Sequence, residues 1–121
     1  MTVPCIGVVD DDEALCSSLV DLMRSAGYRS EAFASAEALL VCDDLGDFDC
    51  IVADVHMPGM GGLSLIEELR QQGVMTPVVL ITALTHAHLD EQARSTGAFC
   101  LLRKPFETSY LLECVERSLL G

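Results

Sequence analysis

Polar and charged side chains stand directly after short apolar runs at four places in this chain, and they are the residues best suited to chemistry. The residues at these ends are Asp10, Asp11, Asp54, Thr82 and Lys104. Two carboxylates about 4 Å apart repel each other by about 4 kcal/mol at an effective dielectric constant of 20. Three aspartates gathered in one place would therefore need a cation among them to stay ionised.

Mg²⁺ suits such a site, because it takes one or two carboxylates, keeps several waters and accepts a phosphate oxygen. With a metal bound by Asp11 and Asp54, a free oxygen of Asp54 could attack a phosphoryl donor. The ammonium of Lys104 and the hydroxyl of Thr82 would stabilise the charge that develops on the phosphoryl oxygens. These residue types together predict phosphoryl transfer to Asp54.

Lys104 is the only lysine of the chain, whereas the other six basic residues are arginines. A single lysine directly before a proline indicates that a compact point charge is needed at this position. Pro105 disfavours a helical conformation at Lys104, and a Lys-Pro bond is cis in some fixed turns. Either isomer of this bond would hold the lysine at the pocket, and the sequence leaves the choice open.

These residues need a scaffold that brings the ends of separate strands together. Short β-rich runs alternate with segments of helical periodicity, which predicts parallel strands joined by helical crossovers. The expected strands cover residues 5–9, 28–33, 50–53, 78–81 and 99–102. The first, third and fourth are apolar throughout, as is typical of strands buried on both faces of a doubly wound sheet. We therefore expect an α/β fold, a (βα)₅ sandwich with its functional crevice at the carboxyl ends of the strands.

Composition limits the classes of protein to consider. The 121 residues fit a single domain, 1–121, with half of them apolar. The net charge of −12 argues against direct nucleic-acid binding by this domain, which would need clustered bases. No apolar run approaches the roughly 20 residues that cross a bilayer, and the start lacks a basic secretory segment, so we expect a cytoplasmic protein without membrane contact. Six cysteines without a Cys-x-x-Cys pair predict reduced, structural thiols.

Five segments, taken in order, resemble the response regulator receiver family, also called CheY-like. They are residues 8–12, 54–62, 81–83, 97–98 and 104–106. The resemblance spans the chain and implies a flavodoxin-like sheet with strand order 2-1-3-4-5. The segments 35–37 and 104–107 are most similar to FixJ-like receivers, which are often followed by a DNA-binding domain.

The resemblance also implies roles for individual residues. Asp54 would accept a phosphoryl group from a histidine kinase or phosphotransfer protein of a two-component system. Mg²⁺, or Mn²⁺, would be bound by Asp11, Asp54 and the backbone carbonyl of His56, with Asp10 acting mainly through a metal-bound water. The residues implied to bind or sense the phosphoryl group are Thr82, Ala83, Lys104 and Leu101, with Pro105 forming the adjacent turn. The domain would be a signalling module that assists its own phosphorylation, not an enzyme acting on other substrates.

The output would pass through the surface of helix four, strand five and helix five, which could also form a homodimer and control transcription. This chain departs from the family pattern at Leu101, where the switch residue is usually Tyr or Phe. Phe99 should face the same side as Leu101 and could stand in for it. Gly61 replaces a common helix-capping residue, which is a mild change because Gly is tolerated there.

Four other side chains near these motifs merit interpretation. His56 and Leu84 flank the site and are expected to influence the lifetime of the phosphoryl group, although His56 could equally be a solvated loop residue. His86 and His88 lie in a helix expected over 86–96, and positions i and i+2 do not share a helix face. We therefore expect no metal site at this His-x-His.

Several alternatives remain open from the sequence. A receiver-like module that signals without phosphate is one, and Leu101 keeps it in view. A haloacid-dehalogenase-like phosphatase also uses an aspartate, Mg²⁺ and a lysine, but its nucleophile would be Asp10 and Asp54 would have no role. A flavin-binding protein of the same topology lacks its phosphate loop here, and the aspartates at 10–12 would repel a flavin phosphate.

Overall fold

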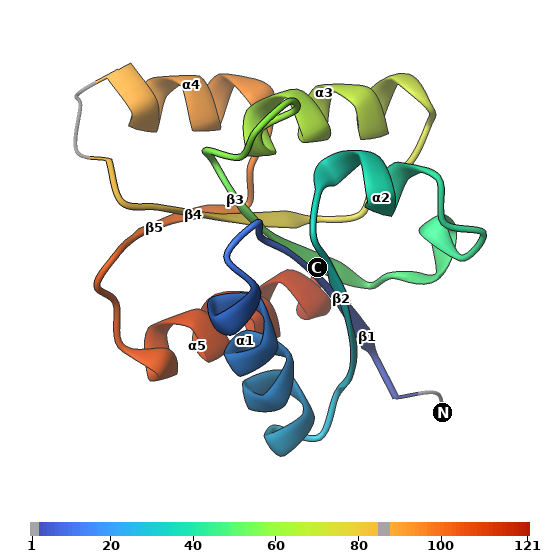
Figure 1. Cartoon of the computed structure of the whole chain (residues 1–121), viewed down its shortest axis with the longest axis vertical. Helices are drawn as coiled ribbons and strands as arrows, with labels where there is room; N and C mark the ends of the chain where they lie inside the picture. The colour runs from blue at the N-terminus through green and yellow to red at the C-terminus, as the bar shows by residue number, and fades with distance from the viewer. Residues whose placement is uncertain (1–2, 85–87) are drawn as a thin grey trace.

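The computed structural model describes residues 3–84 and 88–121. Within these residues, parallel strands form one sheet in the order β2-β1-β3-β4-β5, which confirms the expected topology (Figure 1). The strands are β1 (Cys5–Val9), β2 (Arg29–Phe33), β3 (Cys50–Asp54), β4 (Val78–Thr82) and β5 (Cys100–Arg103). The helices are α1 (Glu13–Ser25), α2 (Ala36–Leu40), α3 (Gly62–Gln71), α4 (His88–Thr96) and α5 (Thr108–Leu120).

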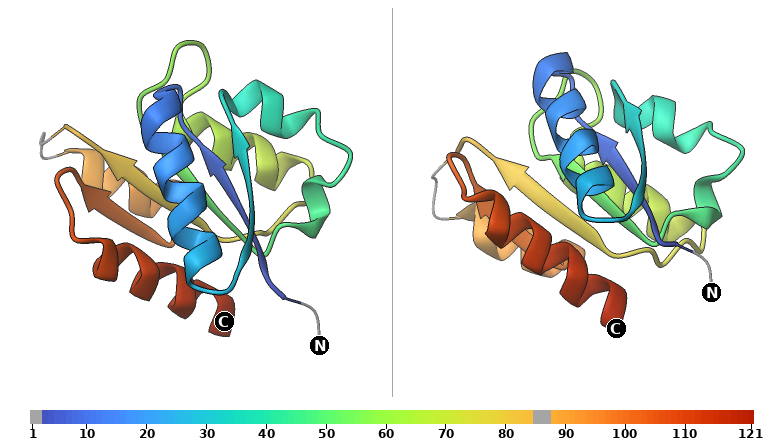
Figure 2. Two further views of the ribbon diagram at one scale, coloured as in Figure 1. Left: turned by 60° about the horizontal axis from the view of Figure 1, so that its bottom comes forward. Right: turned by 90° about the horizontal axis from the view of Figure 1, so that it is seen from below.

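Helices cover both faces of the sheet in three layers. Helices α1 and α5 lie on one face, and α2, α3 and α4 lie on the other (Figures 1 and 2). Each face has its own cluster of buried apolar side chains. Because side chains of a strand alternate between faces, Val79 of β4 packs under α1 and α5 while Leu80 packs under α2 to α4. The sheet is therefore the shared wall of two hydrophobic cores.

The three central strands carry this double burial. Every residue of β1, β3 and β4 is buried, as their continuous apolar sequences predict. Strand β2 is an edge strand of mixed exposure, and every residue of β5, the other edge, is only partly buried. The centre of the sheet is thus packed more densely with protein than either edge.

Local sequence explains how the helices beside the site begin and end. Asp12 caps α1 by accepting a hydrogen bond from the backbone N–H of Leu15. Ser35 caps α2 in the same way, through the N–H of Ala38, as expected from the sequence. Gly27 follows α1 with a φ of +95°, a left-handed conformation that glycine adopts without steric cost.

Element boundaries differ slightly from those expected. Strands β3 and β4 are one residue longer and include Asp54 and Thr82 themselves. A short 3-10 helix, Leu45–Asp47, was not anticipated. The helix expected from residue 86 is described from His88 onward. His86 lies outside the described residues, so the interpretation of the His-x-His is not tested. No helix among residues 3–84 and 88–121 is long and apolar enough to span a membrane.

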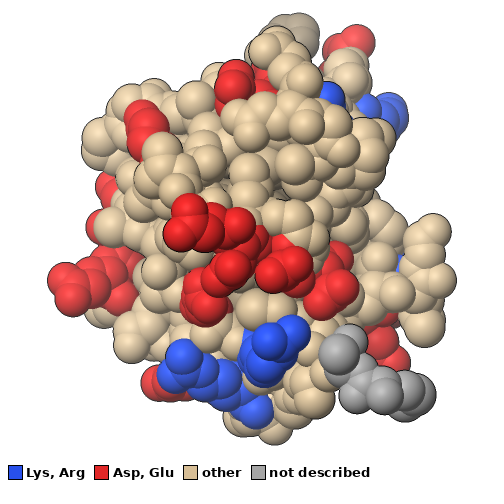
Figure 3. Space-filling model, turned by 90° about the vertical axis from the view of Figure 1, so that its right-hand side faces the viewer, with Lys and Arg blue, Asp and Glu red and all other residues tan. Residues whose placement is uncertain are grey.

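Acidic side chains dominate one face of the molecule. Figure 3 shows them gathered in the middle of that face, with a smaller group of basic side chains beside them. The connection from α2 to β3 contributes four exposed acids, Asp43, Asp44, Asp47 and Asp49. A surface of this sign repels phosphate backbones, so we do not expect this face to bind nucleic acid.

Candidate functional site

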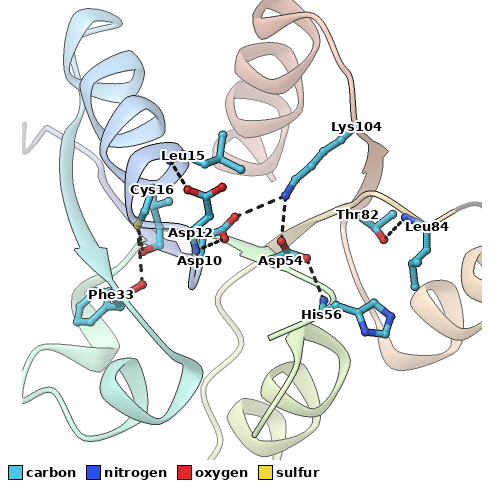
Figure 4. Close-up of polar contacts among 11 residues, drawn as sticks. Asp10, Asp12, Leu15, Cys16, Phe33, Asp54, His56, Thr82, Leu84 and Lys104 are labelled. Carbon is cyan, nitrogen blue, oxygen red and sulfur yellow. Dashed lines mark hydrogen bonds and ion pairs between the residues drawn. The ribbon is translucent and has the colours of Figure 1, made fainter. Parts of the chain in front are cut away.

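The carboxyl ends of β1, β3, β4 and β5 bring the predicted residues together. Asp10 follows β1, Asp54 and Thr82 are the last residues of β3 and β4, and Lys104 follows β5. Figure 4 shows their side chains converging above the sheet. Asp10, Asp54 and Thr82 are 1%, 7% and 0% exposed, so three polar groups sit in a largely dry environment. Burial on this scale requires that each group has a partner or a function.

Lys104 provides the positive charge of the site. Its Nζ lies 3.0 Å from Oδ2 of Asp54 and 3.8 Å from Oδ2 of Asp10. The backbone N–H of Lys104 donates to the carbonyl of Thr82 at 2.7 Å, which extends the pairing of β4 and β5 to the lysine itself. The Lys104–Pro105 peptide bond is cis, which settles the isomer that the sequence left open. The lysine therefore reaches across the sheet to the end of β3.

The aspartates form a cluster whose negative charge is only partly neutralised by Lys104. Asp10, Asp11 and Asp54 each place a carboxylate oxygen within 4.8 Å of the others. Oδ1 of Asp10 accepts a hydrogen bond from the N–H of Asp12 at 2.9 Å, but Oδ2 is buried and has no hydrogen-bond partner. Lys104, at 3.8 Å from this oxygen, is beyond hydrogen-bonding distance. Burial raises the pKa of Asp10, and the charge of Asp54 raises it further.

These observations fit a hard divalent cation. Carboxylate and carbonyl oxygens are the ligands that Mg²⁺ and Mn²⁺ prefer. An orphaned buried carboxylate oxygen beside two further carboxylates is a donor set that one cation would satisfy. The chemistry of the pocket is thus compatible with the expected metal ion.

Two backbone turns shape the mouth of the pocket. The N–H of His56 donates to Oδ1 of Asp54 at 2.9 Å, and the N–H of Leu84 donates to Oγ1 of Thr82 at 3.0 Å (Figure 4). The side chains of His56 and Leu84 are both exposed next to the site, and Ala83 is exposed between Thr82 and Leu84. The backbone that follows each of the two strand ends therefore turns back onto the side chain of the last strand residue, Asp54 or Thr82.

Gly62 allows α3 to begin directly behind Asp54. A Cβ at this position would lie 2.7 Å from the carbonyl oxygen of Asp54 and 2.7 Å from a methyl carbon of Leu80. Both distances are too short for a side chain unless a neighbour moves, and the contact with the Asp54 carbonyl could be relieved only by a shift of the backbone. The N–H of Gly62 also donates to the carbonyl of Val55 at 3.1 Å. The sequence indicated Gly62 only as part of a motif, and its steric role is visible only in three dimensions.

Leu101 is the predicted site residue that the structure separates from the pocket. Its side chain belongs to the apolar cluster under α2 to α4, where β5 pairs it with Leu80 of β4. Phe99 precedes β5 and is 41% exposed, whereas Leu101 is partly buried. Gly61 is the N-cap of α3 and provides no side-chain cap, as its sequence implies.

Glu37 is a residue near the site that sequence reasoning did not identify. Its Oε2 accepts a hydrogen bond from the N–H of Met60 at 3.2 Å, in the connection between Asp54 and α3. The two residues are 23 positions apart, and no periodicity or spacing in the sequence indicates such a contact.

Comparison with known proteins agrees with this geometry. The family model described as "Response regulator receiver domain" matches residues 6–116. The transcriptional regulatory protein FixJ of Azorhizobium caulinodans is 37% identical over 114 residues, which are 94% of this chain and 54% of that protein. FixJ of Bradyrhizobium diazoefficiens is 35% identical over 94% of this chain and 56% of its own length. The chain thus spans about half the length of these curated relatives.

Solved structures share the whole fold. The structure titled FixJ-N superposes with a TM-score of 0.89 at 29% identity, covering 100% of this chain and 97% of that chain. A chemotaxis protein of Vibrio cholerae gives a TM-score of 0.89 at 28% identity, covering 98% of this chain and 100% of that chain. With a family match from β1 to α5 and the same five-stranded order, this chain belongs to the response regulator receiver family and is a FixJ-like receiver domain.

Proposed function

We propose that the chain, as a single receiver domain over residues 1–121, accepts a phosphoryl group on Asp54 in a Mg²⁺-dependent reaction. The donor would be a histidine kinase or phosphotransfer protein, the class of partner that the receiver family uses. One observation carries the proposal: Lys104 lies 3.0 Å from a carboxylate oxygen of Asp54, beside an unpartnered oxygen of Asp10. Lys104 is closer to Asp54 than to Asp10, which favours Asp54 as the nucleophile over Asp10, the nucleophile of the phosphatase alternative.

Three carboxylates and one carbonyl would hold the ion. We assign Asp11, Asp54 and the backbone carbonyl of His56 as direct ligands, with Asp10 acting through a bound water. The clustering of the aspartates and the burial of Asp10 support this assignment. The bound ion would neutralise the carboxylates and the phosphoryl oxygens that approach them.

The residues of the chain then have distinct tasks in the transfer. An oxygen of Asp54 attacks the phosphorus, and the bond from phosphorus to the nitrogen of the donor histidine breaks as the new O–P bond forms. The electron pair of the broken bond leaves with the imidazole. Lys104 exchanges its contact with Asp54 for a phosphoryl oxygen, and the hydroxyl of Thr82 donates to another. Ala83, small and exposed, leaves the entrance open.

The response would travel outward from Thr82 and Lys104. The hydroxyl of Thr82 holds the N–H of Leu84 on the way to α4, and Lys104 continues β5. A shift of both residues would therefore move the surface of α4, β5 and α5, through which the domain would pair with a second copy or control an output. Because the FixJ relatives are named as transcriptional regulators and extend beyond the matched region, we propose that this output is transcription.

Leu101 favours a second candidate function. A side chain packed in the apolar cluster beside Leu80 offers no aromatic ring that could change position on phosphorylation. A receiver-like module that binds its partner without phosphorylation would need no such ring.

Intact mass after incubation with Mg²⁺ and acetyl phosphate separates the two candidates. The first predicts a gain of one phosphoryl group that is lost in Asp54→Asn and kept, more slowly, in Asp10→Asn. A chain that gains no mass from acetyl phosphate, phosphoramidate or a phosphorylated kinase would favour the module that acts without phosphate. Loss of the adduct in Asp10→Asn but not in Asp54→Asn would restore the phosphatase reading.

A further inference from the structure

The connection between Asp54 and α3, residues 55–61, is fixed firmly at its two ends. The N–H of Val55 donates to the carbonyl of Ile81 at 2.8 Å, and the carbonyl of Val55 accepts from Gly62 at 3.1 Å. His56 turns back onto the Asp54 carboxylate through its N–H. The carbonyl that would face the ion belongs to His56, so the path of this connection determines where that ligand lies.

One contact from outside holds the middle of the connection. The N–H of Met60 donates to Oε2 of Glu37 at 3.2 Å, and among the described residues no other element hydrogen-bonds to residues 57–60. The same carboxylate packs on Gly59, where a Cβ would lie 2.6 Å from Oε2. Gly59 has a φ of +78°, so both its conformation and its surroundings favour glycine. A single side chain therefore contacts two consecutive residues of the connection.

Helix α2 gives Glu37 a fixed base. Its neighbours Ala36 and Leu39 are fully buried in the core, and the Ser35 cap holds the first turn through the N–H of Ala38. Helix α2 packs beside α3, at the start of which the connection ends (Figure 1). Although Glu37 is exposed, its backbone belongs to a helical turn that is packed on the core. Little backbone conformational entropy is therefore lost when its side chain contacts the connection.

We infer that Glu37 is a positioning residue for the metal site: it orders residues 57–60 before the ion arrives and so raises the affinity for Mg²⁺. Fixing the backbone of one residue costs about 1–2 kcal/mol of conformational entropy. A connection already held by α2 does not incur this cost when the His56 carbonyl becomes a ligand. The inference rests on the proposed function, because it concerns the ion of that same site.

Three substitutions separate the hydrogen bond from the charge. In Glu37→Ala both are lost; Glu37→Gln keeps an acceptor oxygen at the same reach but no charge; Glu37→Asp keeps the charge on a shorter side chain. We expect Glu37→Ala and Glu37→Asp to weaken Mg²⁺ binding about fivefold, the effect of one ordinary hydrogen bond, and Glu37→Gln to stay within about twofold of the wild type. Isothermal titration with Mg²⁺ measures the dissociation constants, and Glu116→Ala on the exposed face of α5 is the control for general charge.

Amide hydrogen exchange without metal provides a readout independent of the ion. The N–H of Met60 should exchange about five times faster in Glu37→Ala and Glu37→Asp than in the wild type or Glu37→Gln. The amides of Ile66 and Leu80 in the core should be unchanged, since a merely destabilised fold would accelerate them as well.

A double-mutant cycle tests the contact with Gly59. Gly59→Ala would displace the Glu37 carboxylate and strain a left-handed backbone position. In a Glu37→Ala background only the strain remains. The loss of Mg²⁺ affinity in the double mutant should therefore be smaller than the sum of the losses in the two single mutants. Additive effects would show that Glu37 does not act through this connection.

Other results would overturn the inference in distinct ways. If Glu37→Asp matches the wild type while Glu37→Gln matches Glu37→Ala, the charge acts at a distance and the hydrogen bond is irrelevant. If all three variants bind Mg²⁺ as the wild type does, α2 has no influence on the site. A wild-type chain that binds no Mg²⁺ would refute the proposed function and this inference together, whereas one that binds Mg²⁺ but takes no phosphate refutes only the former.

Discussion

Lys104 of the pocket directly follows Arg103 at the end of β5, yet the pocket and the β5 edge of the sheet differ in burial and in the contacts of their charged groups. The pocket has buried polar groups at the ends of strands whose residues are all buried. At the edge, β5 is partly exposed throughout. Arg103 forms an exposed bidentate ion pair with Asp90 of α4, in which its two terminal nitrogens lie 3.2 and 3.1 Å from the two carboxylate oxygens. Fixed, dry groups suit charge stabilisation, whereas shallow packing lets an element shift at little cost. The proposed chemistry would therefore lie on the fully buried strands of the sheet, and the proposed response on its partly exposed edge.

Neighbouring side chains make the contrast measurable. Arg103 and Lys104 are consecutive bases, one contacting Asp90 on α4 and the other Asp54 in the pocket. We expect Lys104→Met to slow phosphorylation of Asp54 by about 100-fold, the typical effect of removing one donor to a developing anion. Arg103→Met should leave that rate within about twofold, because its partner lies outside the pocket. Rates of adduct formation with acetyl phosphate, read by mass, test both, and equal losses in the two variants would erase the distinction.

Leu80 and Leu101 offer the same comparison for stability. They are paired across β4 and β5 and pack into the same cluster, but Leu80 is fully buried and Leu101 only partly so. Leu80→Ala should lower the free energy of unfolding by about 3 kcal/mol, within the usual range for a core leucine, and Leu101→Ala by about 1 kcal/mol. Urea denaturation monitored by circular dichroism measures both, and a larger loss at Leu101 would show that the edge is the better packed region.

His56 and Leu84 test whether exposed residues at the pocket mouth affect its chemistry. Both flank the acceptor through turns at the ends of β3 and β4. An apolar Leu84 would hinder an attacking water, and His56 could either position or block one, so each change to alanine should alter the decay of the phosphoryl group about two- to fivefold. Decay after removal of the donor gives the rates, with Leu120→Ala at the exposed end of α5 as the control. Unchanged decay in both variants would assign His56 to the solvated loop.

The smallest effect is expected at the ion pair of the edge. The guanidinium of Arg103 lowers the pKa of Asp90 below its ordinary value of 3.8. A carboxyl with a lowered pKa stabilises the fold above its ordinary pKa and loses that contribution as the pH falls through the lowered value. Asp90→Asn should therefore lower the thermal midpoint slightly at pH 7 and not at all at the acid limit, with the difference reduced by salt. A midpoint difference that persists at pH 2 would show that the pair acts through packing.

Much of this arrangement follows from local pattern. The ends of four strands could be predicted because an apolar run terminates visibly at a polar residue, and parallel topology then places those ends together. Asp10, Asp54, Thr82 and Lys104 do lie together, as expected. The second strand, which contributes no such group, is the edge strand anticipated for it.

Contacts that depend on side-chain direction or on loop path could not be predicted. The hydrogen bond from Met60 to Glu37 joins the connection after β3 to helix α2, and the approach of the two depends on the packing of α2 against α3. Phe99 was expected to face the same way as Leu101, and it lines the same hollow beside α4 as Leu101, but it lies one residue before β5 and is 41% exposed. Alternation of faces predicts the side on which a residue lies, but not how much of its side chain the neighbouring elements cover.

Gly62 has a consequence for how tolerance to substitution is interpreted in this chain. Any side chain there would collide with the carbonyl of Asp54, the proposed acceptor, and with the core side chain of Leu80. In a saturation-mutagenesis screen for signalling, position 62 would therefore be as intolerant as position 54, although it takes part in no proton or phosphoryl transfer. Only a chemical readout, such as the stoichiometry of the adduct on the folded fraction, would separate the residue that reacts from the one that makes room for it.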